Sequence, residues 1–255
     1  MSSAERNFKE RLRAGDLLVG TWVKTPSPIV TEVLAGTELD LLCLDAEHAP
    51  FDRLVLDGCI LAARSRQMPS LVRIPADRPE HILNALDLGA TGIVIPHVMD
   101  ERRAREAVRA CLYGPGGRGY AGSSRAANYT RTTMAKHIAA STNSNAIVAQ
   151  IEDREGVENI PAIAGVEELD CLFIGRADLA VALGVPSSTA PEVIAVSERI
   201  CDASRAAGKA VGMFVPDLKE VPHWRSRGVS LFLLESDHTF LIRGAQALAN
   251  AVRAA

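Results

Sequence analysis

Carboxylate side chains stand at two places where an apolar segment of the sequence gives way to polar residues. Glu152 follows AIVAQI, and Asp178 follows LFIGRA. Two carboxylates whose remaining positions are left to water and substrate oxygens suit Mg²⁺, Mn²⁺ or Co²⁺. Zinc is less expected because no obvious set of His and Cys accompanies them, although carboxylates alone do not exclude it. These two residues are therefore the candidate ligands of a divalent cation.

Other polar residues follow apolar segments in the same way. Arg73 can stabilise negative charge that develops on an enolate or aldol oxygen. His48, on the loop after the segment that Asp45 ends, can act as a general base, directly or through water. His97 either lines the pocket or makes a hydrogen bond at its rim. A carboxylate after a strand often caps the next helix instead of binding a ligand, so the hypothesis depends on the convergence of these residues.

The segment from Gly175 to Asp178 opens a short predicted helix, ADLAVAL. The first N–H groups of a helix have no partner within it, and the helix dipole favours an anion there. This segment can therefore hold the carboxylate of a substrate.

The elements that must position these side chains are short β-rich segments that alternate with longer helical ones. Several β-rich segments are nearly continuous apolar runs, which are typical of parallel strands covered on both faces. Eight strand-then-helix units fit a closed (β/α)8 TIM barrel better than the alternative, a doubly wound open sheet. In such a barrel the active site lies at the C-terminal ends of the strands. The predicted strands are 17–23, 39–45, 69–74, 91–96, 146–152, 169–174, 209–215 and 229–234, and helical spacing is clear in 79–88, 100–110 and 191–207.

Length and composition fit one large α/β domain over residues 1–255, since (β/α)8 barrels run to about 250 residues. The net charge of −3 indicates no nucleic-acid or anionic-membrane partner. Five scattered cysteines without C-x-x-C spacing argue against a disulfide framework, so a cytoplasmic location is expected. The N-terminal stretch lacks the apolar region of a signal peptide, and no apolar run approaches the roughly 20 residues that span a bilayer.

The competing chemistry would replace the metal ion by a lysine that forms a Schiff base with a carbonyl substrate. Lys209 begins its predicted strand and so faces the wrong end of the barrel, while Lys9, Lys136 and Lys219 fall outside the strands. Lys24, just past the first predicted strand, is the one candidate. Nothing in the sequence supplies the desolvation or the neighbouring cation that would lower the pKa of its amine. The metal route is therefore favoured.

The longest interruption of the alternation is the glycine-rich stretch 113–131. It lacks the G-x-x-x-x-G-K-[ST] pattern and does not follow a predicted strand, so it is not a phosphate loop. Long loops in compact domains usually have a function. We expect an active-site or interface loop here.

Three motifs stand in order at the ends of predicted strands: D-x-E-H at 45–48, Q-x-E at 150–152 and G-x-A-D-L at 175–179. In these motifs the sequence resembles the HpcH/HpaI aldolase family, metal-dependent pyruvate aldolases of the phosphoenolpyruvate/pyruvate barrel superfamily. The resemblance runs from about Gly20 to Asp237. It implies a class II aldolase, a carbon–carbon lyase that forms or cleaves 4-hydroxy-2-oxo acids from pyruvate and an aldehyde through a metal-bound enolate.

The resemblance also implies a role for each matching residue. Glu152 and Asp178 would bind the metal. His48 would be the base that works through water, and Asp45 and Asp87 would orient and tune it.

The substrate contacts are implied in the same way. Arg73 would contact the carbonyl or enolate oxygen of pyruvate, and Gln150 would lie beside the keto acid. The amides of Ala177 and Asp178 would hold its carboxylate. The family further implies a homo-oligomer, commonly a hexamer built from dimers, with the last helix packed on a neighbouring subunit.

Two departures from the family pattern concern substrate choice. Arg176 stands where many members have proline, and a bulky cation near the mouth of the site is expected to alter substrate preference. His97 stands where methionine is frequent.

Two alternative functions stay open. The same metal and enolate site can serve an acyl-CoA lyase or an oxaloacetate decarboxylase, and Arg118 and Arg125 can form a basic groove for CoA. The second alternative is a non-catalytic keto-acid-binding protein on a barrel fold.

Overall fold

Eight parallel strands close into a barrel in the computed structural model, which describes residues 6–254. Each strand pairs with the next in chain order, and β8 pairs with β1. The predicted barrel is therefore confirmed, and the doubly wound open sheet is wrong. Residues 1–5 and 255 of the predicted domain lie outside the described part. The strands are β1 (Leu18–Val23), β2 (Leu41–Asp45), β3 (Ser70–Arg73), β4 (Gly92–Ile95), β5 (Ala146–Ile151), β6 (Cys171–Ile174), β7 (Ala210–Val215) and β8 (Val229–Ser236).

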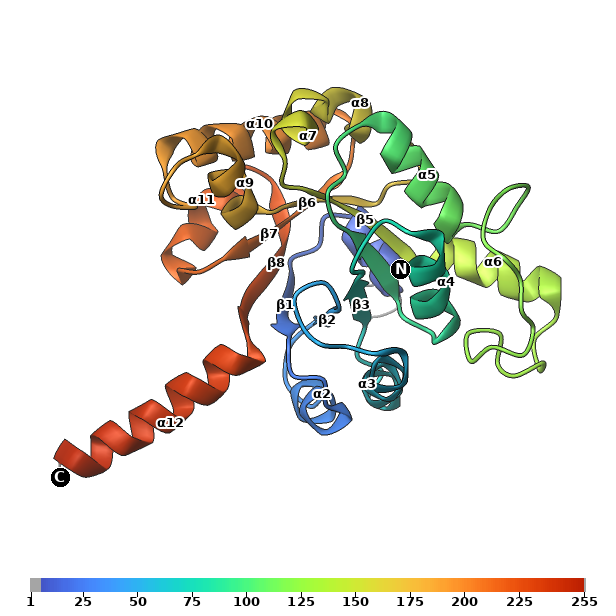
Figure 1. Ribbon diagram of the computed structural model, residues 1–255, viewed down its shortest axis with the longest axis horizontal. Helices are drawn as coiled ribbons and strands as arrows, with labels where there is room; N and C mark the ends of the chain where they lie inside the picture. Colours follow the sequence, from blue (N-terminus) through green and yellow to red (C-terminus); the bar gives the residue numbers. More distant parts are fainter. Residues whose placement is uncertain (1–5, 255) are drawn as a thin grey trace.

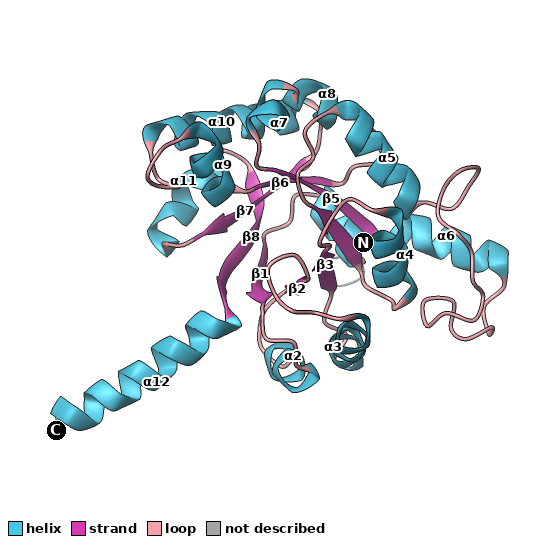
Figure 2. Cartoon of the chain, viewed as in Figure 1, coloured by secondary structure: helices cyan, strands magenta, loops and turns pink. Residues whose placement is uncertain are grey.

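Helices follow the strands and surround most of the barrel (Figure 1; Figure 2). The predicted helices 79–88, 100–110 and 191–207 are observed as α4, α5 and α10 with shifts of a residue or so. The helices are α1 (Phe8–Arg13), α2 (Pro28–Ala35), α3 (Arg53–Ser65), α4 (Pro79–Asp87), α5 (Glu101–Cys111), α6 (Met134–Ser144), α7 (Arg154–Glu158), α8 (Ile160–Ala164), α9 (Arg176–Leu183), α10 (Pro191–Ala206), η2 (Leu218–Glu220), α11 (Val221–Ser226) and α12 (Asp237–Ala254).

The strands are buried on both faces, which explains their continuous apolar sequences. Side chains on the inner faces form one apolar cluster, in which Trp22 and Phe173 meet edge to face with ring centroids 5.9 Å apart. Phe8 and Leu12 of α1 join this cluster and close the N-terminal end of the barrel. A larger cluster packs the outer faces against the helices. The C-terminal rim is left for polar side chains.

The last helix, α12, points away from the barrel that it follows (Figure 1). Among its described residues only Asp237 is buried, and that carboxylate accepts hydrogen bonds from the backbone of Lys24 and Thr25. Its apolar side chains Ile242 and Leu248 are 68% and 73% exposed. An amphipathic helix gains most of its stability by packing its apolar face, and α12 has no such packing on its own barrel. Among residues 6–254, no helix combines the length and the hydropathy needed to cross a membrane.

Candidate active site

Side chains from four strands meet inside the C-terminal rim of the barrel. Asp45 ends β2 and lies in register with Arg73, which ends β3. Side chains alternate across a strand, so Asp45 shares the inner face with Cys43, and Gln150 shares it with the buried Val148. The same alternation directs Glu152, the residue after β5, inward. The sequence therefore placed these residues at the correct end of the barrel.

Arg73 and Asp45 form a buried ion pair at the base of the rim. The Arg73 Nε and Nη2 donate to the two carboxylate oxygens of Asp45 at 2.9 and 2.8 Å. The guanidinium also lies over the Trp22 ring, 4.3 Å from its centroid. Burial alone would raise the pKa of Asp45, but the hydrogen bonds and charge of Arg73 outweigh it and hold that pKa below its usual value. Two neighbours thus fix the arginine in one orientation.

Glu47 connects this pair to the rest of the rim, although the sequence analysis gave it no role. Its Oε2 lies 3.2 Å from Arg73 Nε and 3.6 Å from His48 Nε2. Burial raises the pKa of Glu47 even though Arg73 opposes that shift. The D-x-E-H motif contained the signal, because a carboxylate two residues after Asp45 follows the same strand end.

His48 lies at the mouth of the rim, with its side chain 55% exposed. Asp45 orients this residue through the main chain, because the His48 N–H donates to Asp45 Oδ1 at 3.2 Å. Asp87 does not join them within one chain. Helix α4 runs back from the rim, and its last residue, Asp87, pairs there with Arg118. The expectation that Asp87 tunes His48 is therefore not met within a single chain.

Glu152 is almost fully buried at the rim, with a relative exposure of 2%. Its Oε1 accepts from the backbone N–H of His97 at 2.8 Å, and its Oε2 accepts from the side-chain amide of Gln150. Burial, together with the charges of Asp178 and Glu47, raises the pKa of Glu152 to about 7. In the part of the chain that the structure describes, no lysine or arginine forms an ion pair with Glu152. Such a carboxylate fits a bound cation, which would supply the missing positive charge.

The turn from β6 into α9 passes directly beside Glu152. A Cβ on Gly175 would lie 2.7 Å from the Glu152 Cβ, so only glycine fits there. Ala177 is exposed and Asp178 half-buried in the first turn of α9, where backbone amides lack partners within the helix. The buried Oε1 of Gln150 has no hydrogen bond among the described residues. The start of α9 therefore lies directly against Glu152 and Gln150.

His97 and Lys24 are the remaining polar residues of the rim. Ligand atoms of Glu47, His97 and Glu152 all lie within 4.8 Å of one another. The Lys24 ammonium lies 3.2 Å from Asp45 Oδ2. This ion pair gives no support to a Schiff-base role, which requires an amine with a lowered pKa.

Arg176 does not occupy the mouth of the site. Its guanidinium is buried over the Trp224 ring, 5.2 Å from the centroid, and donates to the Ser188 carbonyl at 2.9 Å. An ion pair of 2.7 Å with Glu220 neutralises it. The expectation that its charge alters substrate preference at the mouth is therefore corrected: the side chain joins α9 to α11 instead.

The glycine-rich loop 113–131 also lies away from the rim. It connects the end of α5 to α6, which leads into the N-terminal end of β5. Arg118 pairs with Asp87, and Arg125 pairs with Asp57 at 2.7 Å. The loop therefore forms no part of this chain's rim, and Arg118 and Arg125, the two arginines considered for a CoA groove, are paired with carboxylates.

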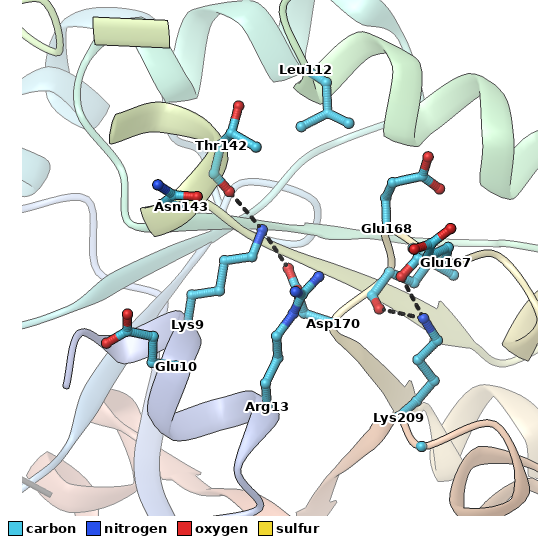
Figure 3. Close-up of a pocket in the computed structure, with 12 residues that line it drawn as sticks. Lys9, Glu10, Arg13, Leu112, Thr142, Asn143, Glu167, Glu168, Asp170 and Lys209 are labelled. Carbon is cyan, nitrogen blue, oxygen red and sulfur yellow. Dashed lines mark hydrogen bonds and ion pairs between the residues drawn. The ribbon is translucent and has the colours of Figure 1, made fainter. Parts of the chain in front are cut away.

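A cavity of about 710 Å³ lies at the opposite end of the barrel (Figure 3). There Lys9 and Arg13 point toward the buried Asp170, and both form ion pairs with it. The Lys209 ammonium donates to the Glu167 and Leu169 carbonyls. These cations already have partners, so the size of this cavity does not make it the functional site.

Comparisons with known proteins agree with this geometry. The sequence model of the HpcH/HpaI aldolase/citrate lyase family matches residues 18–243. The chain is 34% identical to a 5-keto-4-deoxy-D-glucarate aldolase of Shigella boydii over 90% of each chain. It is also 34% identical to a pyruvate aldolase of Rhizobium etli, covering 95% of this chain and 96% of that protein. A solved HpcH/HpaI aldolase/citrate lyase family protein from Burkholderia cenocepacia superposes with a TM-score of 0.90 and 33% identity, over 96% of this chain and 98% of the other.

Proposed function

The chain belongs to the HpcH/HpaI aldolase/citrate lyase family, and on that premise we propose that it is a class II aldolase that depends on a divalent metal. It cleaves or forms 4-hydroxy-2-oxo acids, with pyruvate and an aldehyde as the two halves. The observation that carries this proposal is the buried Glu152, which forms no ion pair with a lysine or arginine among the described residues and lies close to other carboxylates.

Glu152 and Asp178 are the proposed metal ligands. The raised pKa of Glu152 arises partly from the charge of Asp178, which indicates that the two carboxylates are near each other. Mg²⁺, Mn²⁺ or Co²⁺, when bound, would supply positive charge that polarises the 2-oxo group and stabilises the negative charge developing there.

The substrate's carboxylate is proposed to lie at the N-terminus of α9. The amides of Ala177 and Asp178 would donate to it, with the helix dipole favouring the anion. Gln150 would lie beside the keto acid; its Nε2 donates to Glu152 Oε2, and its Oε1 has no hydrogen bond among the described residues. Gly175 allows this close approach because it has no side chain.

Arg73 and His48 are proposed to act on the reacting atoms. Arg73 is held by Asp45 and Trp22, so its guanidinium is preorganised to donate to an oxygen that becomes negative. His48 is exposed at the mouth and can exchange protons with water, which suits a base that works through a water molecule.

Deuterium exchange into the methyl group of pyruvate tests the proposal. Protein stripped of metal should exchange no methyl protons in D₂O, and Mn²⁺, Co²⁺ or Mg²⁺ should restore exchange. Glu152→Gln should abolish it at any Mn²⁺ concentration that saturates the wild type. Glu155→Gln, the same change at an exposed position on α7, is the matched control and should exchange normally. Full exchange without metal would contradict the proposal.

A substrate panel separates the carbon–carbon lyase from its alternatives. We expect cleavage of 4-hydroxy-2-oxo acids to exceed decarboxylation of oxaloacetate and cleavage of acyl-CoA thioesters. The pairing of Arg118 and Arg125 with carboxylates leaves the acyl-CoA alternative without its expected groove. Exchange of pyruvate protons would also exclude a non-catalytic keto-acid-binding protein.

We also propose that residues 1–255 act as one barrel domain within a homo-oligomer. The exposed apolar side chains of α12 support exchange of this helix between subunits. On the barrel, α2 exposes Ile29 and Val33, which offer an apolar surface of the kind that such a helix covers. A chain truncated before α12 should sediment as a smaller species than the full chain.

A further inference from the structure

His97 is held by two contacts that fix both its backbone and its ring. It follows β4 with a φ of 54°, a left-handed conformation that histidine adopts more readily than most side chains. Its backbone N–H donates to Glu152 Oε1 at 2.8 Å. Its Nδ1 lies 3.0 Å from Asp153 Oδ2, within hydrogen-bond distance. The ring is therefore oriented by the residue next to Glu152.

The other ring nitrogen, Nε2, faces the carboxylates of the rim. It lies 3.6 Å from Glu47 Oε1, beyond ordinary hydrogen-bond distance. Glu152 Oε1 lies 3.5 Å from Nδ1. Ligand atoms of Glu47, His97 and Glu152 all lie within 4.8 Å of one another, close enough for a small movement of these side chains to bring them around one ion.

A histidine that binds a metal through one nitrogen almost always donates its other N–H to a carboxylate or carbonyl group. Asp153 supplies that acceptor for Nδ1, which leaves the Nε2 lone pair toward Glu47. An imidazole nitrogen and a carboxylate oxygen that face each other across such a gap can share a cation between them. The arrangement thus has both the orienting partner and the acidic neighbours that a histidine ligand requires.

We propose that His97 Nε2 is a direct ligand of the divalent ion, so that this chain binds its metal through an imidazole as well as through carboxylates. The inference rests on the proposed function, because it concerns the same ion as Glu152. It also implies a shifted metal preference. Imidazole suits Co²⁺ and Zn²⁺ better than Mg²⁺, which prefers oxygen ligands. His97 therefore makes the site selective for ions that accept nitrogen.

Pulsed electron paramagnetic resonance of the full chain with Mn²⁺ tests this directly. A bound imidazole should give a ¹⁴N coupling in the wild type, and His97→Asn should remove it. Asparagine tolerates the left-handed backbone, so the variant should keep the turn while losing the ring. His48→Asn is the matched control at the other rim histidine and should keep the coupling.

Metal affinities measured by calorimetry give a second readout. His97→Asn should weaken Co²⁺ binding at least about tenfold and Mg²⁺ binding less. Asp153→Asn should also weaken Co²⁺ binding, by roughly 10–100-fold, the usual effect of losing a partner that orients a metal-bound histidine.

The outcomes separate the two proposals. If Mn²⁺ binds with no ¹⁴N coupling, or if the coupling persists in His97→Asn, the inference about His97 is overturned and the proposed function stands. Equal losses of Co²⁺ and Mg²⁺ affinity in His97→Asn would also overturn it. If Mn²⁺ does not bind the wild type at all, both proposals fail.

Discussion

The two ends of the barrel both bury carboxylates, but they neutralise them differently. At the N-terminal end, Asp170 is fully buried and paired with Lys9 and Arg13, and it also accepts from the backbone of Ile147 (Figure 3). At the C-terminal rim, Glu152 is nearly as buried and has only amide donors and His97 beside it. Cationic side chains neutralise the first carboxylate, whereas the second forms no ion pair with a lysine or arginine among the described residues.

The paired carboxylate at the N-terminal end stabilises the fold, whereas the carboxylate at the C-terminal rim is suited to binding a ligand. A buried charge that is paired and hydrogen-bonded maintains one structure, while an unneutralised one costs stability until a ligand arrives. Proteins commonly accept such a cost at functional sites.

Removing the charge of Asp170 should cost the most. Asp170→Asn leaves the buried Lys9 ammonium without its carboxylate, and breaking a buried pair in this way costs about 3–5 kcal/mol. Chemical denaturation of the metal-free protein measures the loss. Glu168→Gln, in the same cavity but without an ion pair there, should change the unfolding free energy little. Equal effects of the two changes would remove the basis for calling this end structural.

Removing Arg73 should impair turnover more than metal binding. Arg73→Ala should lower kcat about 10²–10³-fold, the usual loss when a preorganised donor to a developing negative charge is removed. Mn²⁺ affinity measured by calorimetry should stay within a few-fold of the wild type. An unchanged kcat would show that Arg73 does not act on the reacting oxygen.

Removing the charge of Glu152 should stabilise the metal-free protein, whereas removing the charge of Asp170 should destabilise it. In the metal-free protein at pH 8, Glu152→Gln should raise the unfolding free energy by about 1–3 kcal/mol, the cost of a poorly satisfied buried polar group. The pKa of Glu152 is raised from 4.5 to about 7, so its contribution to stability is present below pH 4.5 and is lost as pH rises through 7. The advantage of the variant should therefore shrink on acidification from pH 8 to pH 5. If Glu152→Gln is less stable than the wild type at pH 8, the two ends of the barrel do not differ in this way.

The sequence predicted the C-terminal rim better than the ion pairs at the N-terminal end, because the two ends depend on different features of the chain. The strands were predicted because parallel strands covered on both faces are continuously apolar, and their ends then located Asp45, Arg73 and Glu152. The Lys9–Asp170 pair joins residues far apart in sequence, and only the closed barrel brings them together. Lys9 lies outside the strands, and its position in the sequence gives no sign that it pairs with Asp170.

The directions of individual side chains were the least predictable feature. Arg176 follows a strand end as the functional residues do, yet it turns outward onto Trp224 because Glu220 and Ser188 offer partners there. Asp87 matched the family pattern, but α4 carries it away from the rim. Glu47 was inside a recognised motif and was overlooked because its partners, Arg73 and His97, come from other strands. Such contacts depend on packing, which spacing along the chain does not encode.

The smallest expected effect concerns His137, which lies on α6 beside the loop 113–131. Burial and the charge of Arg118 lower the pKa of His137, and its Nε2 contacts the Tyr113 hydroxyl at 2.9 Å. Because the unfolded chain takes up this proton first, the wild type should lose stability as pH falls below 6.5. The unfolding free energy of the wild type minus that of His137→Gln should therefore decrease between pH 8 and pH 5. A difference that does not vary with pH would mean that His137 titrates normally.

Anomalous X-ray diffraction from crystals soaked with Mn²⁺ and pyruvate tests the central claim most directly. The account predicts one strong manganese peak inside the C-terminal rim, bonded to Glu152 and Asp178, with pyruvate beside it and its carboxylate at the first turn of α9. A manganese peak in the cavity beside Asp170, or none at the rim at saturating Mn²⁺, would contradict it.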